Sequence, residues 1–489
     1  MQYFELLLFI SSSIYVLFSI KINTSLSKRM LFGILGSMLL LHLIFEGFRW
    51  QMIPIYLIWV LAILSVRRYK TNASRSVGSL LKMVLVIFLM LPGIALPFLF
   101  PVFDLPIPSG DYTVGTKDLV LQLDRAEVIT RNPHDKREIA IKVFYPSNKT
   151  EGIKDPYIDQ GGRHGFALKY GLPKGAFNYL DKVDTHVFRN AEIARETFPV
   201  LIFSHGYNSK ANGYYAILSE LASQGYVIFS LNHSYESTGS TLSGGKEIYF
   251  DYEYAQSIEK DTWQKMEPVV EAFKMDLPFE QRHPIVKKGL TSYFVKDMVE
   301  RWATDISDVV TELSSMNEEG FFKNRLDTNS IGVFGHSRGG GAAGHALLKD
   351  PRIKAGANLD GVQWGDIVNT SFEQPFLFIS ADWPEEKEDL NSHAYVHKSK
   401  SVFYDARILN TGHSNFMDIP LMIPFRSLSE AGAIDPRKGL KITGEAVTFF
   451  FDTHLQNKKR DLKRLSDEIQ ELEISIYSGR GDKGLALYK

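Results

Sequence analysis

The sequence predicts an α/β fold, a mostly parallel sheet with helices on both faces, preceded by an N-terminal bundle of about four transmembrane helices. Two observations lead to this prediction. The first hundred of the 489 residues are dominated by Leu, Ile, Phe, Met and Val, whereas the remainder has the mixed composition of a soluble domain. In that remainder, short apolar runs alternate with stretches of helical spacing, which indicates parallel strands joined by helices. The length alone predicts more than one structural unit.

Apolar runs predict the membrane segment, which we expect to cover residues 1–104. Crossing the hydrocarbon core of a bilayer takes about 20 apolar residues in a helix. The runs cover residues 3–22, 30–48, 53–66 and 77–103. The third run reaches that length only if Gln51 and Met52 join it. Three spans are therefore the alternative to four.

Basic residues predict the side of the membrane on which the rest of the chain lies. The loops after the first and third runs hold Lys21, Lys28, Arg29, Arg67, Arg68, Lys70 and Arg75. Basic loops of this kind stay in the cytoplasm. With four spans the chain is an integral protein of the cell membrane whose soluble part is extracytoplasmic, whereas three spans would place that part inside. Glu46 and Arg49 lie near the end of the second run and are expected to snorkel to the interface.

Composition divides the rest of the chain into a linker, a main domain and a tail. A stretch with several prolines predicts a stiff linker over residues 105–114, and the main domain follows over residues 115–456. Within it, residues 234–300 have no place in the alternation of strands and helices. We expect them to form a cap insertion, because long insertions in compact domains are usually functional. Residues 457–489 are expected to form a C-terminal helical tail.

The main domain is expected to open with an antiparallel strand pair, at residues 112–123 and 139–145, around a turn-like Asn-Pro-His-Asp sequence. Continuous apolar runs, typical of strands buried on both faces, predict further strands at residues 198–204, 226–231, 330–334, 355–359, 375–379 and 401–409. Helical spacing predicts helices over residues 214–223, 301–315 and 340–348.

Net charge and the absence of cysteine limit the possible functions. The formal net charge is −1, so no overall field attracts nucleic acid, and no nucleic-acid partner is expected. The absence of cysteine excludes disulfides, thiolate metal sites and a cysteine nucleophile. We expect neither a cofactor nor a metal ion. The sequence makes no prediction of the oligomeric state.

The strongest motif is the sequence Gly-His-Ser-Arg-Gly at residues 335–339, between an expected strand and an expected helix. A sharp strand-to-helix turn holds its central serine in a strained conformation, and the neighbouring glycines remove side chains that would collide. The serine hydroxyl is then presented at the top of the sheet, beside free helix amides that favour negative charge. Ser337 is therefore the predicted nucleophile of an α/β-hydrolase fold.

A serine nucleophile needs a histidine base that is oriented by a carboxylate, and in this fold the order along the chain is serine, acid, histidine. His413, directly after the last expected strand, is the best candidate for the base. The other late histidines are His393, His397 and His454, for which exposed or helical positions are expected. Asp360 and Asp382 each end an expected strand, and the spacing of the residues does not choose between them.

The oxyanion of the reaction needs two backbone N–H donors. Arg338, directly after the nucleophile, supplies the first, and Tyr207, after the early His-Gly pair, is expected to supply the second. His205 and His233 also end strands and could suggest a metal site. Without acidic partners at ligand spacing, we expect them to order loops instead.

Five stretches together resemble the plasma-type platelet-activating-factor acetylhydrolase family. They are IAIKVFYPS at 139–147, FPVLIFSHG at 198–206, GVFGHSRGG at 332–340, ANLDG at 357–361 and GHSNF at 412–416. The resemblance runs from about residue 115 to 455 and leaves out the membrane segment. It implies Asp360 rather than Asp382 as the acid, with Tyr207 and Arg338 as oxyanion donors. Where members of the family often carry Phe after the nucleophile this chain has Arg338, and the insertion after Ser234 is its own.

The resemblance also implies calcium-independent removal of short or oxidised acyl chains from phospholipids. With the motif, it predicts a membrane-anchored serine ester hydrolase that acts on a lipid or small ester through Ser337, His413 and Asp360. Acyl transfer, thioester cleavage and polyester hydrolysis on the same triad are alternatives within enzymes. A membrane sensor or binding protein with an inert hydrolase domain is the alternative from another class.

Overall fold

The computed structural model describes most of the chain in two compact units. The residues described are 1–18, 25–67, 77–259, 262–363, 370–383, 390–391, 395–396, 399–479 and 485–487. The first unit comprises residues 1–103 with 422–424, and the second comprises the rest of the chain from Asp104 onward. The boundary between them falls beside the expected end of the membrane segment.

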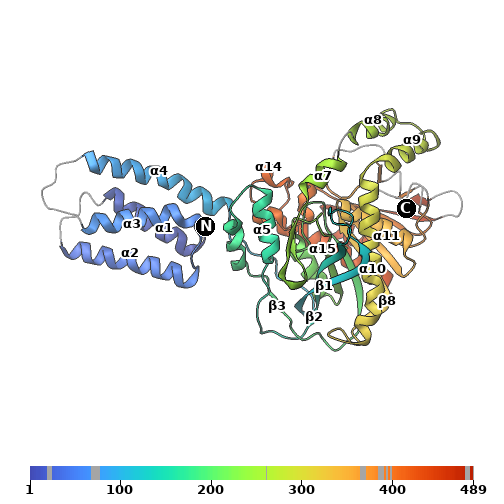
Figure 1. Cartoon of the computed structure of the whole chain (residues 1–489), viewed down its shortest axis with the longest axis horizontal. Coiled ribbons are helices and arrows are strands. Elements are labelled where there is room, and N and C mark those ends of the chain that lie inside the picture. Colours follow the sequence, from blue (N-terminus) through green and yellow to red (C-terminus); the bar gives the residue numbers. More distant parts are fainter. Residues whose placement is uncertain are drawn as a thin grey trace. The chain divides into compact units, whose positions relative to one another are not determined.

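The N-terminal unit is a bundle of helices that lie side by side (Figure 1). Its helices are α1 (Tyr3–Phe18), α2 (Ser25–Phe45), α3 (Ile53–Arg67) and α4 (Val77–Leu99), with the short helix η2 (Trp50–Met52) before α3. Each apolar run of the sequence is therefore helical over most of its described length. Among these residues, one helix is long and apolar enough to cross a membrane, at Leu80–Leu99, and the remaining apolar helices are shorter. Four spans thus stay a prediction.

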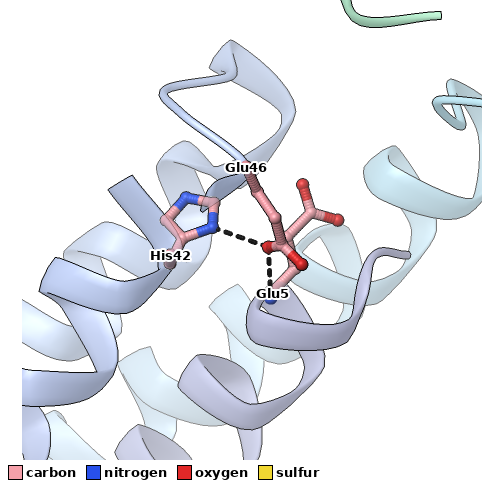
Figure 2. A group of neighbouring side chains, drawn as sticks. All are labelled: Glu5, His42 and Glu46. Atoms are coloured by element: carbon pink, nitrogen blue, oxygen red, sulfur yellow. Dashed lines mark hydrogen bonds and ion pairs between the residues drawn. The ribbon is translucent and has the colours of Figure 1, made fainter. Parts of the chain in front are cut away.

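Buried polar and charged side chains join the N-terminal end of α1 to the C-terminal end of α2 (Figure 2). The Glu46 carboxylate accepts the backbone N–H groups of Phe4 at 2.6 Å and Glu5 at 2.9 Å, so it caps the first turn of α1. Its neighbour His42 contacts Glu46 at 3.0 Å. Arg49 pairs with Glu5 at 2.7 Å, and both of these side chains are fully buried. The expectation that Arg49 snorkels is wrong, because a carboxylate of α1 reaches it inside the bundle.

The second unit is built on an 11-stranded sheet in the order β13-β12-β11-β10-β9-β8-β4-β5-β2-β1-β3. Its strands are β1 (Thr113–Ala126), β2 (Lys136–Ser147), β3 (Val187–Arg189), β4 (Phe198–Ser204), β5 (Val227–Asn232), β8 (Leu326–His336), β9 (Ile353–Leu359), β10 (Phe376–Ser380), β11 (Phe403–Ile408), β12 (Leu472–Gly479) and β13 (Leu485–Leu487). The central strands from β5 to β11 pair in parallel. The mixed α/β fold and the expected strands are confirmed.

Helices cover both faces of this sheet (Figure 1). They include α6 (Tyr215–Ser223), α10 (Val295–Glu318), α11 (Arg338–Lys349) and α15 (Pro436–Leu455). Helices α10 and α11 share one hydrophobic cluster with alternate residues of β4, among them Val200 and Ile202. On β8, Gly332 lies against Phe451 of α15. A Cβ added to Gly332 would lie 2.6 Å from the Phe451 ring. All residues of β4 and β5 are buried, as expected for strands covered on both sides.

The insertion at residues 234–300 adds elements outside this layered core. It contains a two-stranded sheet of β6 (Gly239–Thr241) and β7 (Glu247–Tyr249), then helices α7 (Tyr252–Ile258), α8 (Thr262–Lys274) and α9 (Phe279–Ser292). Helices α8 and α9 pack closely, because a Cβ on Gly289 would lie 2.4 Å from Val269. They form an arm that projects from the body of the unit (Figure 1).

The C-terminal tail differs from the expected helical tail. Among the described residues of the tail, the helical ones belong to α16 (Leu462–Glu468), and β12 and β13 extend the sheet beyond β11. In β12, Leu472 and Ile474 are buried while Glu473 between them is exposed. This period of two is the pattern of a strand with one covered face, and the helical interpretation overlooked it.

Candidate active site

Ser337 occupies the turn between β8 and α11, in a conformation that only a strongly constrained turn imposes. Its φ is 56° and its ψ is −129°, which costs a non-glycine residue about 1–3 kcal/mol. Glycine is required on both sides. A Cβ on Gly335 would lie 2.3 Å from the Gly339 carbonyl, and a Cβ on Gly339 would lie 2.2 Å from that of Ser204. The predicted strand–turn–helix geometry is present.

His413 and Asp360 meet at the carboxyl edge of the same sheet. Asp360 follows β9 with φ 51°, and His413 opens the short helix η7 (His413–Phe416) after β11. The His413 Nδ1 lies 2.6 Å from Asp360 Oδ2. The other oxygen of Asp360 accepts the Ala381 N–H and the Trp383 indole N–H, both at 2.8 Å. The His413 side chain is 31% exposed and that of Asp360 is 3% exposed, so the imidazole is accessible while its acid is covered.

Asp382 is engaged elsewhere. One of its oxygens pairs with the Arg407 guanidinium of β11, and the other accepts the Asn410 N–H at 2.7 Å. The N–H bond and the nearby guanidinium lower the pKa of this carboxyl despite some burial. Of the two acids that spacing left open, the structure therefore brings Asp360, and not Asp382, to His413.

A chain of hydrogen bonds through His336 joins the Ser337 turn to the loop that carries His413 and to the loop that carries Gly206. His336 Nε2 lies 3.0 Å from the His413 carbonyl, which can only accept, so Nε2 carries the proton. Its Nδ1 then accepts the Tyr214 hydroxyl at 2.9 Å, and that hydroxyl accepts the Gly206 N–H at 2.9 Å. Burial lowers the pKa of His336 well below its ordinary value, which keeps the ring neutral. The ring centroids of His336 and His413 lie 4.5 Å apart.

Sequence reasoning missed this arrangement. His336 stood inside the motif, but its partner Tyr214 is 122 residues away. The same chain places Gly206 against the nucleophile, since a Cβ on Gly206 would lie 3.3 Å from Ser337 Cβ.

Tyr207 and Arg338, the two expected oxyanion donors, lie beside each other. Tyr207 follows Gly206, and Arg338 is the first residue of α11. The Arg338 guanidinium stacks over the Tyr207 ring, 3.9 Å from its centroid. Within the described parts of the chain, neither backbone N–H donates to another protein group. Both donors are therefore available at the turn that carries Ser337.

Comparison with known proteins identifies the family. A sequence model described as platelet-activating factor acetylhydrolase, isoform II, matches residues 100–473. The chain belongs to this family.

Curated relatives match most of the length of this chain. Platelet-activating factor acetylhydrolase of Gallus gallus is 26% identical over 77% of this chain and 89% of its own. The probable 1-alkyl-2-acetylglycerophosphocholine esterase of Arthroderma benhamiae is 24% identical over 74% of this chain and 91% of its own. Among solved structures, a ferulic acid esterase from Streptomyces cinnamoneus matches 76% of this chain and 99% of its own, with 21% identity and a TM-score of 0.57. The fold fits the α/β-hydrolases, and the chain is a carboxylic ester hydrolase.

The other histidines considered in the sequence either have hydrogen-bond partners in the protein or lie outside the described residues. His205 Nδ1 donates to the Gly206 carbonyl at 2.6 Å, and its Nε2 accepts the His233 N–H at 3.1 Å. His454, in α15, contacts the Tyr404 hydroxyl at 3.1 Å. The structure thus gives His205 the loop-ordering role expected for it. His393 and His397 lie outside the described residues.

One group in the described chain has the composition and spacing of a metal site, and it lies in the N-terminal unit. The ligand atoms of Glu5, His42 and Glu46 are all within 4.8 Å of one another. They already serve other partners, however. Glu5 pairs with Arg49, and Glu46 accepts two backbone N–H groups. A metal ion would have to displace these bonds, so we assign the group to the ion-pair network that closes the bundle.

Proposed function

We propose that this chain is a membrane-anchored serine esterase that cleaves short acyl esters, including those of phospholipids, with Ser337 as nucleophile, His413 as base and Asp360 as acid. The observation that supports this most strongly is the 2.6 Å contact between His413 and Asp360 in a loop tied to the Ser337 turn through His336. That contact occupies Nδ1 and leaves Nε2 of a partly exposed imidazole for the serine.

The proposed reaction has two steps. The Ser337 Oγ attacks the ester carbonyl while His413 Nε2 takes its proton, and the resulting oxyanion accepts the N–H groups of Tyr207 and Arg338. When the tetrahedral intermediate collapses, the alcohol leaves with the proton from His413. Water, deprotonated by His413, then attacks the acyl-serine and releases the acid, which regenerates the hydroxyl.

Asp360 is prepared for its part before substrate arrives. Ala381 and Trp383 donate to its Oδ1, so the carboxylate cannot rotate without losing two hydrogen bonds. Its Oδ2 stays directed at His413, which fixes the tautomer with the proton on Nδ1 and stabilises the imidazolium that forms. No step of this reaction calls for calcium or for any cofactor.

The names of the relatives support the proposed substrate class. One is named a platelet-activating factor acetylhydrolase and another a probable 1-alkyl-2-acetylglycerophosphocholine esterase, so the second name specifies an acetyl ester of a glycerophosphocholine. A short acyl group on a glycerophospholipid is accordingly the substrate we propose.

The N-terminal unit supports membrane anchoring. The apolar side chains that α4 exposes include Leu81, Phe88 and Leu91, which are 64–76% accessible. Such a surface is stable in lipid and costly in water. We propose four spans with the esterase domain outside the cytoplasm. Because the natural chain has no cysteine, a single Lys149→Cys variant provides a clean reporter. An impermeant maleimide should label it in intact cells, whereas labelling only after lysis contradicts the orientation.

We also propose that residues 234–300 act as a cap. Phe250 lies 5.0 Å from Tyr207, edge to face, and Phe294 lies 5.3 Å from the Arg338 guanidinium. Both insertion residues thus border the two expected oxyanion donors. Shortening the arm of α8 and α9 should change KM for long acyl esters more than for acetyl esters, and an equal effect on both would contradict a cap.

The direct test of the proposed function is turnover by the purified full chain in detergent. Ser337→Ala should reduce hydrolysis of p-nitrophenyl acetate to background and abolish labelling by a fluorophosphonate probe. Unchanged turnover in this variant contradicts the assignment. Wild-type protein that neither turns over esters nor reacts with the probe would instead indicate an inert domain.

A further inference from the structure

Arg338 is a charged side chain beside the nucleophile that the proposed mechanism uses only through its backbone. It stands at the first position of α11, where the helix dipole already places partial positive charge. A cation at this end of a helix is electrostatically disfavoured, and a nearby carboxylate would normally compensate it. Among the residues that the structure describes, no carboxylate forms an ion pair with Arg338.

Aromatic rings hold the guanidinium by its faces. Its carbon lies 3.9 Å from the Tyr207 ring centroid and 5.3 Å from that of Phe294, both within the range of cation–π contact. Its hydrogen-bond partner in the described protein is Met298 Sδ, a weak acceptor, at 3.7 Å. Stacking leaves the edge of the guanidinium, with its N–H groups in a planar fork, for a strong acceptor that the described residues do not supply.

The acidic side chains close to the Tyr207 ring have partners of their own. Glu259 forms a hydrogen bond with the Tyr207 side chain. Glu236 is buried, pairs with Arg301 and accepts the Trp302 indole N–H at 2.7 Å. Ser337 and its neighbour Arg338 are both partly exposed, so both are accessible to a bound ester.

We propose that Arg338 recognises an anionic group of the substrate, so that this esterase prefers esters that carry a carboxylate or phosphate near the scissile carbonyl. The inference rests on the proposed function, because it requires the ester to be attacked by Ser337. A planar guanidinium binds both anions through two parallel N–H bonds, and the helix terminus beneath it adds to the attraction. The anion is either a carboxylate on the acyl side or a phosphate on the alcohol side.

The test compares matched anionic and neutral esters in the full chain. For the acyl side, the pair is the p-nitrophenyl ester of glutaric acid and its methyl ester. For the alcohol side, the pair is dibutyrylglycerol phosphate and dibutyrylglycerol, followed through released butyrate. The measured quantity is the ratio of kcat/KM for the anionic ester to that for the neutral ester within each pair. A change that only disturbs folding lowers both members of a pair and leaves their ratio unchanged.

In the wild type this ratio should exceed one for at least one pair, and that pair identifies the source of the anion. Arg338→Gln should lower it by about 10- to 100-fold, the range expected for a charge-assisted hydrogen-bonded pair. Arg338→Lys, which keeps the charge and loses the fork, should retain part of the preference. A wild-type ratio near one for both pairs, or a ratio that Arg338→Gln leaves unchanged, overturns the proposal. Turnover that survives Ser337→Ala indicates that the proposed function itself fails.

Discussion

The esterase domain contains two groups of serine, histidine and aspartate, and their difference shows what a catalytic site requires. In the first, Ser204 Oγ lies 2.8 Å from His233 Nε2, and His233 Nδ1 lies 2.7 Å from Asp305 Oδ2. By hydrogen bonding alone this is a complete triad. In the second group, His413 Nδ1 contacts Asp360 Oδ2. Ser337 occupies the neighbouring turn.

Access and backbone strain separate the two groups. Ser204, His233 and Asp305 are all fully buried, and their backbones carry no positive φ. Ser337 and Asp360 have φ of 56° and 51°. Strain of this kind is maintained where the surrounding structure enforces a particular presentation.

The partners of the buried group also indicate a structural role. Arg137 donates to both oxygens of Asp305, at 3.1 and 2.6 Å, and Trp302 stacks on His233 with centroids 4.2 Å apart. Burial lowers the pKa of His233, so the ring stays neutral in spite of its acid. We therefore interpret Ser204, His233 and Asp305 as a buried hydrogen-bonded group with a structural role.

The largest expected effect separates the two serines. Ser337→Ala should reduce kcat/KM for p-nitrophenyl acetate by about 10⁴- to 10⁶-fold, the loss expected when a nucleophile is removed. Ser204→Ala should change it by less than about 10-fold, because this variant loses one buried hydrogen bond, worth about 1–3 kcal/mol of stability. Kinetics and denaturation of both purified variants make the comparison, and similar activity losses would contradict it.

The next effect separates the two aspartates that end neighbouring strands. Asp360→Asn should lower kcat by up to about 10⁴-fold, because an amide stabilises the wrong tautomer of the histidine. Asp382→Asn is the matched control. It should keep kcat within about 10-fold, because the partners of the Asp382 side chain among the described residues are Arg407 and Asn410. A larger loss in Asp382→Asn than in Asp360→Asn would reverse the assignment.

The buried aspartate should affect stability rather than chemistry. Among the described residues, Asp305→Asn leaves Glu127 as the remaining ion-pair partner of the buried Arg137, and breaking a buried pair costs about 3–5 kcal/mol. Turnover per molecule of folded, probe-reactive enzyme should stay within a few-fold of wild type. Urea denaturation and active-site titration measure the two quantities, and normal stability with lost turnover would contradict the structural role.

Asp418, a buried aspartate that forms no ion pair with the described residues, should make stability depend on pH. Asp418 accepts the Tyr215 N–H at 2.6 Å and the Ala216 N–H at 3.2 Å, and burial raises its pKa to about 7. The folded state therefore holds a proton that the unfolded state has lost above about pH 4. Stability should fall as the pH rises from about 4 to 7, by at most about 1.4 kcal/mol per unit. Asp418→Asn should flatten this dependence between pH 5 and 7, and an unchanged slope would contradict the account.

The smallest expected effect concerns the donor that orients the catalytic acid. Trp383 is 53% exposed, yet its indole N–H binds Asp360. Trp383→Phe keeps an aromatic ring and removes this bond to a charged group, so kcat should fall by about 10-fold with little change in stability. Trp383→Leu as a second variant separates the bond from the ring. A fall in Trp383→Leu without any in Trp383→Phe would show that packing, and not the hydrogen bond, matters.

Local features of the sequence predicted most of the esterase fold and the nucleophile. The glycines around Ser337 and the apolar runs of the central strands act over a few residues, so their consequences can be read directly. The residue spacing could not choose between Asp360 and Asp382, because the choice depends on the pairing of Asp382 with Arg407, which lies on another strand. Tyr214 and His336, or Glu5 and Arg49, likewise meet only through the tertiary fold. Strand β12 could have been found from its alternation, which was present in the sequence.

The measurement that tests the central claim most directly is the position of a covalent adduct. Trypsin cleavage after Arg325 and Arg338 gives a peptide with Ser337, whereas Ser204 falls in the peptide that ends at Lys210. After reaction with a fluorophosphonate, mass spectrometry with fragmentation should locate the adduct on Ser337, in an amount that matches the loss of activity. An adduct on Ser204, or full inactivation with Ser337 unmodified, would contradict the account.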